Sequence, residues 1–445
     1  MKNIYNLVVV YFIKIIIFLM SDILKRGSSF PGLVAKKLSK NLLTFVSNKY
    51  KVVFVTGTNG KTTTTSLIVS VIRENGLSCI TNESGANMYN GILTTFVKNY
   101  SINKKSDYAI IEIDEANLKL VTPFITPYAV VITNIFRDQL DRYGEVYNTL
   151  QLILKGIDNE ETILILNGDE PLLNSIDLKN KKVFFGFDAL VKKEVDTNTE
   201  GCFCIKCNNQ YSYNSVTYNH LGDYFCEKCG FSRPSLTYKV EEILEQDLTY
   251  SIVKIDGITS KLNVGGLYNI YNVLCAYAVT AELGFEKEKV FKTLENQKSA
   301  FGRQEIINVK DKKLVMLLVK NPVGFNEALN SVSLNNNNGT FAFLLNDNYA
   351  DGRDVSWIWD VNFENIDFNK YKSIYFSGTR RYDMAIRIQV AGANVDNTKI
   401  YDEFSSLYDN IVNDENEMIF LFTTYTAMLD FRKFLVTKGH LDKIF

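Results

Sequence analysis

The segment Lys51–Ser66, KVVFVTGTNGKTTTTS, constrains the fold more than any other part of the chain. An apolar run, Val52–Val55, leads into a turn with glycines and then into a helix-length segment. This order predicts a strand, a tight turn and a helix N-terminus, whose backbone N–H groups and helix dipole together form an anion site. Lys61 is placed to reach the outer phosphates of a nucleotide, and the Thr62 hydroxyl to bind Mg²⁺.

The glycine spacing of this turn departs from the usual P-loop pattern. Val55 stands where the first glycine is normally found, and Gly57 takes its place. The alternative is an ordinary strand–helix turn, but we favour a site for ATP or GTP. The residues expected to hold it are Gly57, Thr58, Asn59, Gly60, Lys61, Thr62 and Thr63.

Further apolar segments predict an alternating α/β fold. The runs Tyr108–Ile113, Ala129–Thr133 and Thr162–Leu166 are typical of buried parallel strands, and Thr62–Arg73 is expected to be helical. Ligands gather at the carboxyl ends of parallel strands. Polar residues are found at the carboxyl ends of these predicted strands, and a carboxylate among them could bind Mg²⁺. They are Glu112, Asp114 and Asn134; we favour Glu112 as the metal ligand.

Length and charge narrow the class of protein. A chain of 445 residues is expected to hold two or three domains, and 46% apolar residues indicate a well-buried globular protein. The 49 basic residues nearly balance the 50 acidic ones. No overall positive charge therefore points to a nucleic-acid partner.

Four of the seven cysteines have the spacing of a structural zinc site. Two Cys-x-x-Cys pairs, separated by eighteen residues, would supply four thiolates in tetrahedral geometry. The metal would stabilise an insert too small to form a core alone. The predicted ligands are Cys204, Cys207, Cys226 and Cys229. A redox role is the alternative. Cys202 is a rival ligand with poorer spacing, and His220 is expected in a turn or interface.

The N-terminus carries an apolar run, Leu7–Met20, interrupted only by Lys14. The run is shorter than the roughly 20 residues that cross a bilayer. Basic residues follow it, as expected beside an anionic cytoplasmic leaflet; they are Lys25, Arg26, Lys36, Lys37 and Lys40. We favour an interfacial or anchoring helix. The alternatives are a helix packed on the protein and a true start at Met20.

Further motifs follow one another along the chain. With GTNGKTTT they are IEIDEANL (111–118), ITNIFRDQLDRYGE (132–145), LNGDEP (166–171), GGLYNIYN (265–272), FGRQE (301–305), KNPVGFNEAL (320–329) and DGRDVSWIWDVNFE (351–364). Their order resembles the Mur ligase superfamily, and most closely its MurT-type members, the synthase subunits of lipid II isoglutaminyl synthases. The four-cysteine insert, a zinc ribbon that ends in CGFSRP, is also similar to those members and unlike the biosynthetic Mur ligases.

The resemblance implies further site residues. Asn269 and Asn272, three apart on one helical face, would meet the adenine, and Arg303 would reach ATP from the next domain. Three departures from typical Mur ligases stand out. Gln139 replaces a histidine, and the cationic Lys320 motif replaces the group that grips an amino acid. About fifty residues before the P-loop leave no room for a domain that binds a uridine nucleotide.

The resemblance also implies the chemistry. ATP would convert the α-carboxyl of D-glutamate in the stem peptide of lipid II to an acyl phosphate, and ammonia would convert that to D-isoglutamine. Glutamine hydrolysis normally uses a Cys–His pair, and neither Cys79 nor Cys275 has an evident histidine partner. A GatD-like glutaminase in a heterodimer would supply the ammonia. Asp354 is expected to orient the histidine of that partner, with Asp351 and Asp360 as rivals.

We therefore predict an α/β protein with three parts. Residues 1–41 form an apolar segment and basic linker, 42–300 the Mur ligase-like P-loop domain with a zinc ribbon at 201–234, and 301–445 a Rossmann-like domain. The expected location is the cytoplasm, at the inner face of the membrane. Lys61, Glu112 and Asp354 are the predicted catalytic residues, and ATP, Mg²⁺ and Zn²⁺ the cofactors. Alternatives are an amino-acid ligase of the Mur or folylpolyglutamate-synthase type and a nucleic-acid-binding ATPase.

Overall fold

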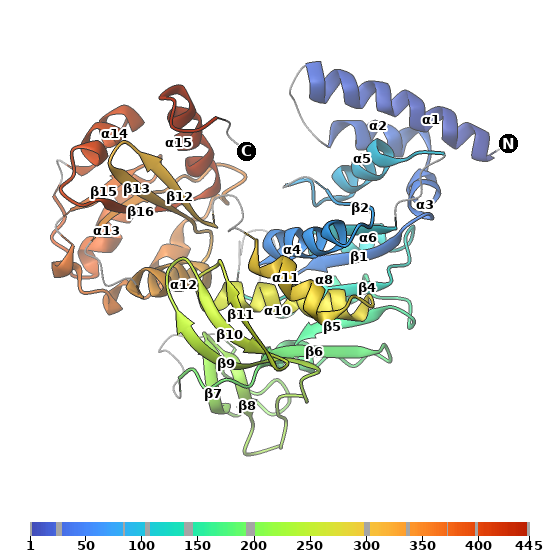
Figure 1. Cartoon of the computed structure of the whole chain (residues 1–445), viewed down its shortest axis with the longest axis horizontal. Helices are drawn as coiled ribbons and strands as arrows, with labels where there is room; N and C mark the ends of the chain where they lie inside the picture. Colours follow the sequence, from blue (N-terminus) through green and yellow to red (C-terminus); the bar gives the residue numbers. More distant parts are fainter. Residues whose placement is uncertain are drawn as a thin grey trace.

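The computed structural model describes residues 2–23, 29–82, 85–102, 107–137, 146–192, 201–297, 303–334, 339–371, 373–396 and 399–442. Figure 1 shows two lobes, each built on its own sheet, with the N-terminal helices on the outer side of the first lobe. The predicted boundary at Ala300 and Phe301 lies outside the described residues.

The first lobe is built on a nine-stranded sheet in the order β11-β10-β9-β6-β5-β4-β1-β3-β2. The strands from β2 to β9 in this order pair in parallel, and β9, β10 and β11 pair antiparallel. The strands are β1 (Lys51–Thr56), β2 (Cys79–Ile80), β3 (Tyr108–Glu112), β4 (Ala129–Ile132), β5 (Ile163–Asn167), β6 (Lys182–Phe187), β9 (Tyr238–Gln246), β10 (Ser251–Ile255) and β11 (Ile258–Leu262).

Helices cover both faces of this sheet because its parallel strands are apolar on both sides. In β1, Val53 and Val55 pack into one core and Val52 and Phe54 into the opposite one, as the two-residue period of a strand requires. The first face carries α4 (Lys61–Glu74), α10 (Leu267–Glu282) and α11 (Lys287–Glu295). The second carries α1 (Lys2–Ile17), α2 (Phe30–Leu38), α3 (Leu42–Ser47), α5 (Tyr89–Asn99), α6 (Leu118–Val121), α8 (Val146–Leu154) and α9 (Pro171–Asn174).

A small hairpin is inserted in the connection from β6 to β9, which are neighbours in the sheet. It consists of β7 (Ser212–Tyr218) and β8 (Leu221–Phe225), which pair antiparallel. Arg233 fastens the insert to the sheet, because its guanidinium bonds Asp169 at 3.1 Å and Asp188 at 2.9 Å. The inserted ribbon is therefore attached to the residues that follow β5 and β6.

The second lobe has a five-stranded sheet in the order β12-β13-β16-β14-β15, parallel except for β12. Its strands are β12 (Arg303–Val309), β13 (Lys312–Leu318), β14 (Thr340–Leu344), β15 (Ile374–Ser377) and β16 (Met418–Thr423). One face packs on α12 (Pro322–Ser333), α13 (Arg381–Val390) and the short 3₁₀ turns η2 (Ser356–Asp360), η3 (Phe363–Asn365) and η4 (Phe368–Lys370). The other packs on α14 (Phe404–Val412) and α15 (Tyr425–Thr437).

The structure confirms the α/β class and the elements that local pattern predicted, with ends shifted by a residue or two. The predicted helix Thr62–Arg73 is α4, and the predicted strands Ala129–Thr133 and Thr162–Leu166 are β4 and β5. The N-terminal run differs in length from the prediction. Asn3–Met20, in α1 and the π-helical turn η1 (Phe18–Ile23), is long and apolar enough to cross a membrane by length and composition. The run Leu7–Met20 therefore understated the helix.

Candidate functional site

The turn between β1 and α4 has the backbone of an anion cradle. Gly57 has a φ of +119° and Gly60 a φ of +84°, in the left-handed region that glycine tolerates best. A Cβ on Gly57 would lie 2.4 Å from the Thr133 hydroxyl oxygen, and one on Gly60 would lie 2.1 Å from Asn272 Oδ1. Both positions therefore require glycine, although the spacing of the motif is unusual.

The cradle is fastened to the end of β4. The Asn134 carboxamide oxygen accepts from the Asn59 backbone N–H at 2.9 Å, and Thr58 exchanges hydrogen bonds with the Phe136 backbone at 3.0 and 3.1 Å. Asn134 thus lies beside the turn, as predicted from the strand end. These bonds hold the N–H groups of the turn in place before any ligand arrives.

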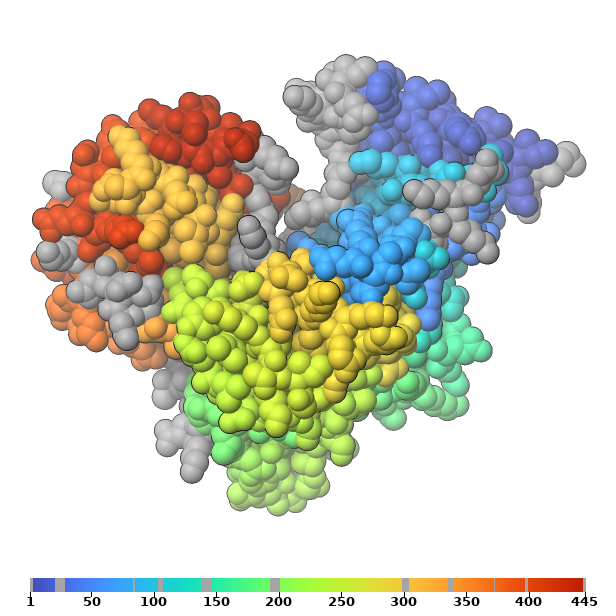
Figure 2. Space-filling model, in the orientation of Figure 1, coloured from blue at the N-terminus to red at the C-terminus, as the bar shows by residue number. Residues whose placement is uncertain are grey.

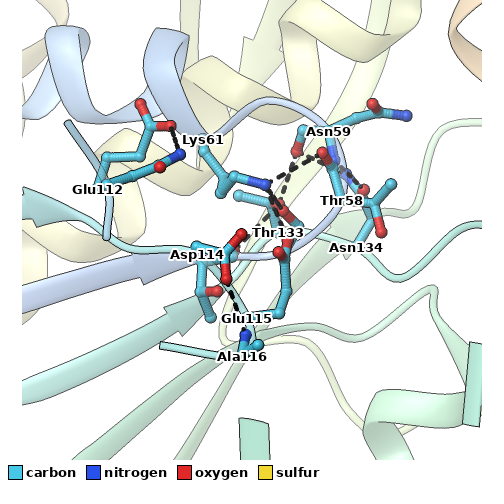
Figure 3. Close-up of polar contacts among 12 residues, drawn as sticks. Thr58, Asn59, Lys61, Glu112, Asp114, Glu115, Ala116, Thr133 and Asn134 are labelled. Atoms are coloured by element: carbon cyan, nitrogen blue, oxygen red, sulfur yellow. Dashed lines mark hydrogen bonds and ion pairs between the residues drawn. The ribbon is translucent and has the colours of Figure 1, made fainter. Parts of the chain in front are cut away.

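Lys61 is held inside the cradle by an acidic partner that the sequence analysis did not single out. Its ammonium group donates to Glu115 Oε1 at 2.8 Å and to the Gly57 and Thr58 carbonyls. The side chains of Lys61 and Glu115 are 13% and 7% exposed, so the pair is largely removed from water. Figure 3 shows Glu115 and Asp114 on the same side of the lysine. Asp114 also accepts from the Ala116 N–H at 3.1 Å.

Thr62 and Glu112 face one another, as a shared metal site requires. The Thr62 hydroxyl donates to Glu112 Oε2 at 2.8 Å, and Glu112 Oε1 accepts from the Asn87 amide at 3.1 Å. Glu112 is buried at the end of β3. A carboxylate and a hydroxyl are hard oxygen donors of the kind that Mg²⁺ prefers. The residues therefore fit a nucleotide-bound Mg²⁺.

The second lobe reaches the same turn. Lys320 donates to the Thr58 carbonyl at 3.2 Å, and the Asn321 amide donates to Asn59 Oδ1 at 3.0 Å. Asn321 also caps α12, because its Oδ1 accepts from the Gly324 N–H at 2.8 Å. The start of α12 is thereby joined to the P-loop.

A cavity of about 80 Å³ lies on one side of this contact, with Asn59, Gly60, Tyr268 and Gln304 in its wall. Asn269 donates to Gln304 Oε1 at 3.0 Å, and Asn272 donates to Asn269 Oδ1 at 3.3 Å. The Gln304 side-chain nitrogen is buried without a hydrogen-bond partner, so it can serve a ligand. Gln304 was not predicted. Arg303 begins β12, but its side chain lies outside what the structure describes.

A larger cavity of about 230 Å³ lies between the ribbon and both lobes. Phe136 and Arg137 line it from the first lobe, Phe203 from the ribbon and Trp359 from the second lobe. Arg137 pairs with Asp360 at 3.4 Å across the two lobes. His220 lies in its wall and bonds Glu170 at 2.9 Å. The cavity adjoins the P-loop through the bonds between Phe136 and Thr58.

The three aspartates proposed for the partner have different surroundings. Asp351 is buried and accepts from the Thr426 N–H at 2.8 Å, and burial raises its pKa. Asp360 is the partner of Arg137. Asp354 is exposed beside η2, where the Ser356 backbone N–H bonds it at 2.8 Å and lowers its pKa. Asp354 and Asp360 are thus both exposed, and Asp360 is engaged by Arg137 across the two lobes.

The four predicted zinc ligands come together. The sulfur atoms of Cys204, Cys207, Cys226 and Cys229 all lie within 4.8 Å of one another. Each pair forms a turn closed by a backbone bond, from Asn208 N to Cys204 O and from Gly230 N to Cys226 O. Asn208 and Gly230 have φ values of 57° and 73°. Four sulfur donors at this spacing could hold a tetrahedral metal ion.

The thiols outside this cluster are poor nucleophiles. Burial raises the pKa of Cys79 to about 11 and raises that of Cys275 further. The chain has two histidines; His220 bonds Glu170 and His440 bonds the Tyr408 hydroxyl at 2.8 Å. In the part of the chain that the structure describes, the Cys79 thiol bonds the Ile80 carbonyl, and the hydrogen bonds of the two histidines go to groups other than Cys79 and Cys275.

Comparison with known proteins gives matches across nearly the whole chain. The family described as the Mur ligase middle domain matches residues 55–280, and the one described as MurT ligase C-terminal matches residues 318–428. The chain is 40% identical over 424 residues to the lipid II isoglutaminyl synthase (glutamine-hydrolyzing) subunit MurT of Streptococcus pneumoniae, covering 94% of this chain and 95% of that one.

Solved structures share the fold at low sequence identity. A pseudomurein peptide ligase type C from Methanothermus fervidus has a TM-score of 0.67 at 20% identity, covering 88% of this chain and 79% of that one. The MurF ligase from Thermotoga maritima in complex with ADP has a TM-score of 0.60 at 14% identity, covering 89% and 83%.

Proposed function

The chain belongs to the MurT family of the Mur ligases, and on that premise we propose that it is the ATP-dependent subunit that amidates lipid II. The substrate would be the α-carboxyl of D-glutamate in the stem peptide, and the product D-isoglutamine. The observation that carries the proposal is the P-loop, in which Lys61, Thr62 and Glu112 meet at one turn within a chain of this family.

The cradle fits a nucleotide and its magnesium ion. The N–H groups around Gly57 and Gly60 would surround the phosphates, with Lys61 on the outer ones. Thr62 and Glu112 would hold Mg²⁺. The base would enter the smaller cavity, where Asn269, Asn272 and the free Gln304 nitrogen offer hydrogen bonds. The bound Mg²⁺ would neutralise phosphate charge during phosphoryl transfer.

The reaction needs an activated carboxyl group because hydroxide is a poor leaving group. A carboxylate oxygen would attack the γ-phosphorus, the bond from that phosphorus to the bridging oxygen would break, and ADP would leave. Ammonia would then attack the carbonyl carbon of the acyl phosphate, lose a proton and displace phosphate. Lys61 and Lys320, which both bond the Thr58 carbonyl, are placed to stabilise the charge on the transferred group.

The acceptor would enter the larger cavity. Its wall combines aromatic side chains such as Phe136 and Trp359 with polar ones such as Arg137, and it adjoins the P-loop through Phe136, whose backbone bonds Thr58. A stem peptide placed there would bring its carboxyl group beside the phosphates. Lipid II as the substrate would also place the enzyme in the cytoplasm, at the inner face of the membrane.

Ammonia would come from a GatD-like glutaminase subunit. The raised pKa values of Cys79 and Cys275 and the engaged histidines favour a separate nucleophile. Asp354 would orient the histidine of that partner. Beside it, α13 exposes Tyr382, Ile386 and Val390 at helical spacing, and Arg387 of α13 bonds the Ile358 carbonyl of η2 at 3.1 Å. This apolar stripe would extend the partner surface.

The four clustered cysteines would hold Zn²⁺ in a structural role. Their sulfur donors and turn geometry fit that ion, and the small cluster of Cys204, Tyr211, Tyr224 and Cys226 gives the ribbon little other core.

The function is tested with lipid II, Mg-ATP and ammonium chloride, and the products are separated by mass spectrometry. We expect one amidated product and release of ADP. Incorporation of an added amino acid without amidation would instead favour the Mur-type or folylpolyglutamate-synthase-type ligase. Lys61→Ala should abolish turnover, whereas Lys155→Ala, at an exposed lysine of the same domain, should not.

The partner role of Asp354 is tested with glutamine and the glutaminase subunit. Asp354→Asn should impair glutamine-driven amidation and leave the ammonium-driven reaction unchanged. Asp367→Asn is a matched control, because Asp367 is also exposed and, like Asp354, accepts a hydrogen bond from the backbone N–H two residues on. An equal loss of both reactions in Asp354→Asn would contradict the proposed role.

A further inference from the structure

The helix α1 is apolar on two faces, of which one is buried and the other exposed. Val9, Val10 and Ile13 are almost fully buried against the helices that cover the first sheet. The outer face of α1 and η1 consists of eight large apolar side chains that are 45–68% exposed: Ile4, Tyr5, Val8, Tyr11, Phe12, Ile15, Phe18 and Leu19. They recur at three- and four-residue spacing and form one continuous stripe.

Hydrogen bonds from polar groups, one of them the hydroxyl of the exposed Tyr5, tie α1 to the protein along its length. The Tyr5 hydroxyl donates to the Leu38 carbonyl at 2.8 Å, and Asn6 Oδ1 accepts from the Ser39 hydroxyl at 2.8 Å. Lys14 donates to the Tyr100 carbonyl. A helix that crossed a bilayer would lose these bonds and would carry Lys14 into hydrocarbon, which costs several kcal/mol. The contacts therefore keep α1 on the surface of the protein, with its stripe outward.

The charge around this stripe is strongly positive. Residues 1–51 contain nine lysines and arginines and one aspartate, a net charge of +8. Because the whole chain has a net charge of −1, the remaining residues carry −9. On α2, which packs against α1, Lys36 and Lys37 are exposed together with Phe30 and Leu33. The basic charge thus gathers in the part of the chain that carries the apolar stripe.

We propose that the outer face of α1 docks on an anionic phospholipid bilayer, with the helix axis parallel to the membrane surface. The apolar stripe would enter the boundary between headgroups and acyl chains, where tyrosine rings are favoured, and the lysines of α2 would pair with acidic headgroups. A second copy of the chain is a poorer occupant, since residues 1–51 carry a net charge of +8 in each copy and the two like-charged segments would repel one another.

An enzyme that lies with α1 on the membrane surface is suited to a substrate carried by a lipid. Figure 2 shows the N-terminal helices along one edge of the molecule, across a notch from the C-terminal lobe. The docking does not depend on the proposed amidation, because the P-loop residues take no part in it. Lys61→Ala should therefore bind vesicles as well as the wild type does, which separates the two proposals.

The test measures sedimentation of the full chain with vesicles. One type contains phosphatidylcholine alone, and the other equal parts of phosphatidylglycerol and phosphatidylcholine. We expect binding to the anionic vesicles that weakens with salt. The double variant Val8→Asp and Phe12→Asp should reduce the partition coefficient at least about tenfold. Its matched control, Leu190→Asp with Leu244→Asp, changes two exposed apolar side chains, one in the connection after β6 and one in β9, and should leave binding unchanged.

A second variant tests the charge without touching the stripe. Lys37→Gln with Lys40→Gln should lower binding up to about thirtyfold at low salt, from about 1 kcal/mol per lysine near an anionic surface. The choice of an anionic bilayer would be overturned if the wild type bound both vesicle types equally and the lysine variant bound them as well as the wild type does.

Other occupants give different results. The proposal would be overturned if the wild type bound no vesicles and the Val8→Asp and Phe12→Asp variant disrupted a dimer or a complex with the glutaminase. Such a result would assign the stripe to a protein partner. An equal loss of vesicle binding in the Leu190→Asp and Leu244→Asp control would overturn it as well.

Discussion

The pair between Lys61 and Glu115 predicts an unusual separation of stability from nucleotide affinity. The pair is 2.8 Å long and largely buried, and it is made with the lysine that a nucleotide would need. In Glu115→Gln the lysine keeps the Gly57 and Thr58 carbonyls but loses a charged acceptor. A hydrogen bond to a charged group contributes about 1.5–3 kcal/mol, so we expect the free energy of unfolding without nucleotide to fall by about 2 kcal/mol.

Binding of Mg-ATP should not weaken in this variant. In the wild type, Lys61 must break its ion pair with Glu115 to reach the phosphates. In the variant that ion pair is absent, so its free energy is not lost on binding. By the thermodynamic cycle, whatever destabilises only the nucleotide-free form appears as tighter binding. A difference of about 2 kcal/mol sets an upper limit of about thirtyfold in Kd.

Two measurements check this: chemical denaturation followed by circular dichroism, and calorimetric titration with Mg-ATP. The matched control is Glu160→Gln, which breaks a pair with Lys179 whose side chains are 70% and 83% exposed; it should change stability by less than about 1 kcal/mol. A more than tenfold loss of Mg-ATP affinity in Glu115→Gln would refute the reasoning, because Glu115 would then serve the ligand directly.

Three further perturbations follow from single contacts. Gly60→Ala should abolish nucleotide binding, because its Cβ would lie 2.1 Å from Asn272 Oδ1, whereas Gly76→Ala, at φ +80° in open space, should cost only the left-handed backbone energy of about 1–2 kcal/mol. Cys226→Ser should lose bound zinc, measured by metal analysis, while Cys275→Ser should retain it. Arg380 lowers the pKa of Asp383 and helps to lower that of Asp347. The two aspartates therefore contribute to the free energy of unfolding above their unfolded pKa near 3.8, and this contribution is lost as the pH falls through their lower folded pKa values. Arg380→Gln should flatten that loss in denaturation midpoints below about pH 4.

The parts of the fold that follow from local pattern could be predicted. The strand and turn around Gly60 require apolar residues followed by glycines, and the motif places a helix N-terminus after them although α4 is rich in β-branched residues, so β1 and α4 follow from the motif. Two Cys-x-x-Cys pairs constrain their own turns, and the four sulfur atoms meet as predicted. Glu112 was predicted because it ends β3, and its carboxylate does bond Thr62.

Contacts between distant segments could not be predicted. IEIDEANL offers three carboxylates in four positions, and only the path of the chain after β3 brings Glu115 to Lys61. Gln304 becomes a wall of the smaller cavity because the second lobe meets α10, which no local signal reveals. In α1 both faces are apolar, so hydrophobic periodicity cannot tell the buried side from the exposed one.

The second lobe connects the proposed partner surface to the P-loop through one helix. Lys320 and Asn321 bond the turn at the start of α12, and Asn326 in α12 accepts from the Asn362 N–H at 2.9 Å, beside η2 and Asp354. Lys320 must leave the Thr58 carbonyl to reach a phosphate, so we expect nucleotide binding to change the contact between the P-loop and the start of α12. The glutaminase and Mg-ATP should therefore change each other's Kd by the same factor, and Asn326→Ala should reduce that factor. Titrations of either ligand in the presence and absence of the other would detect it, and independent affinities would contradict a mechanical link through α12.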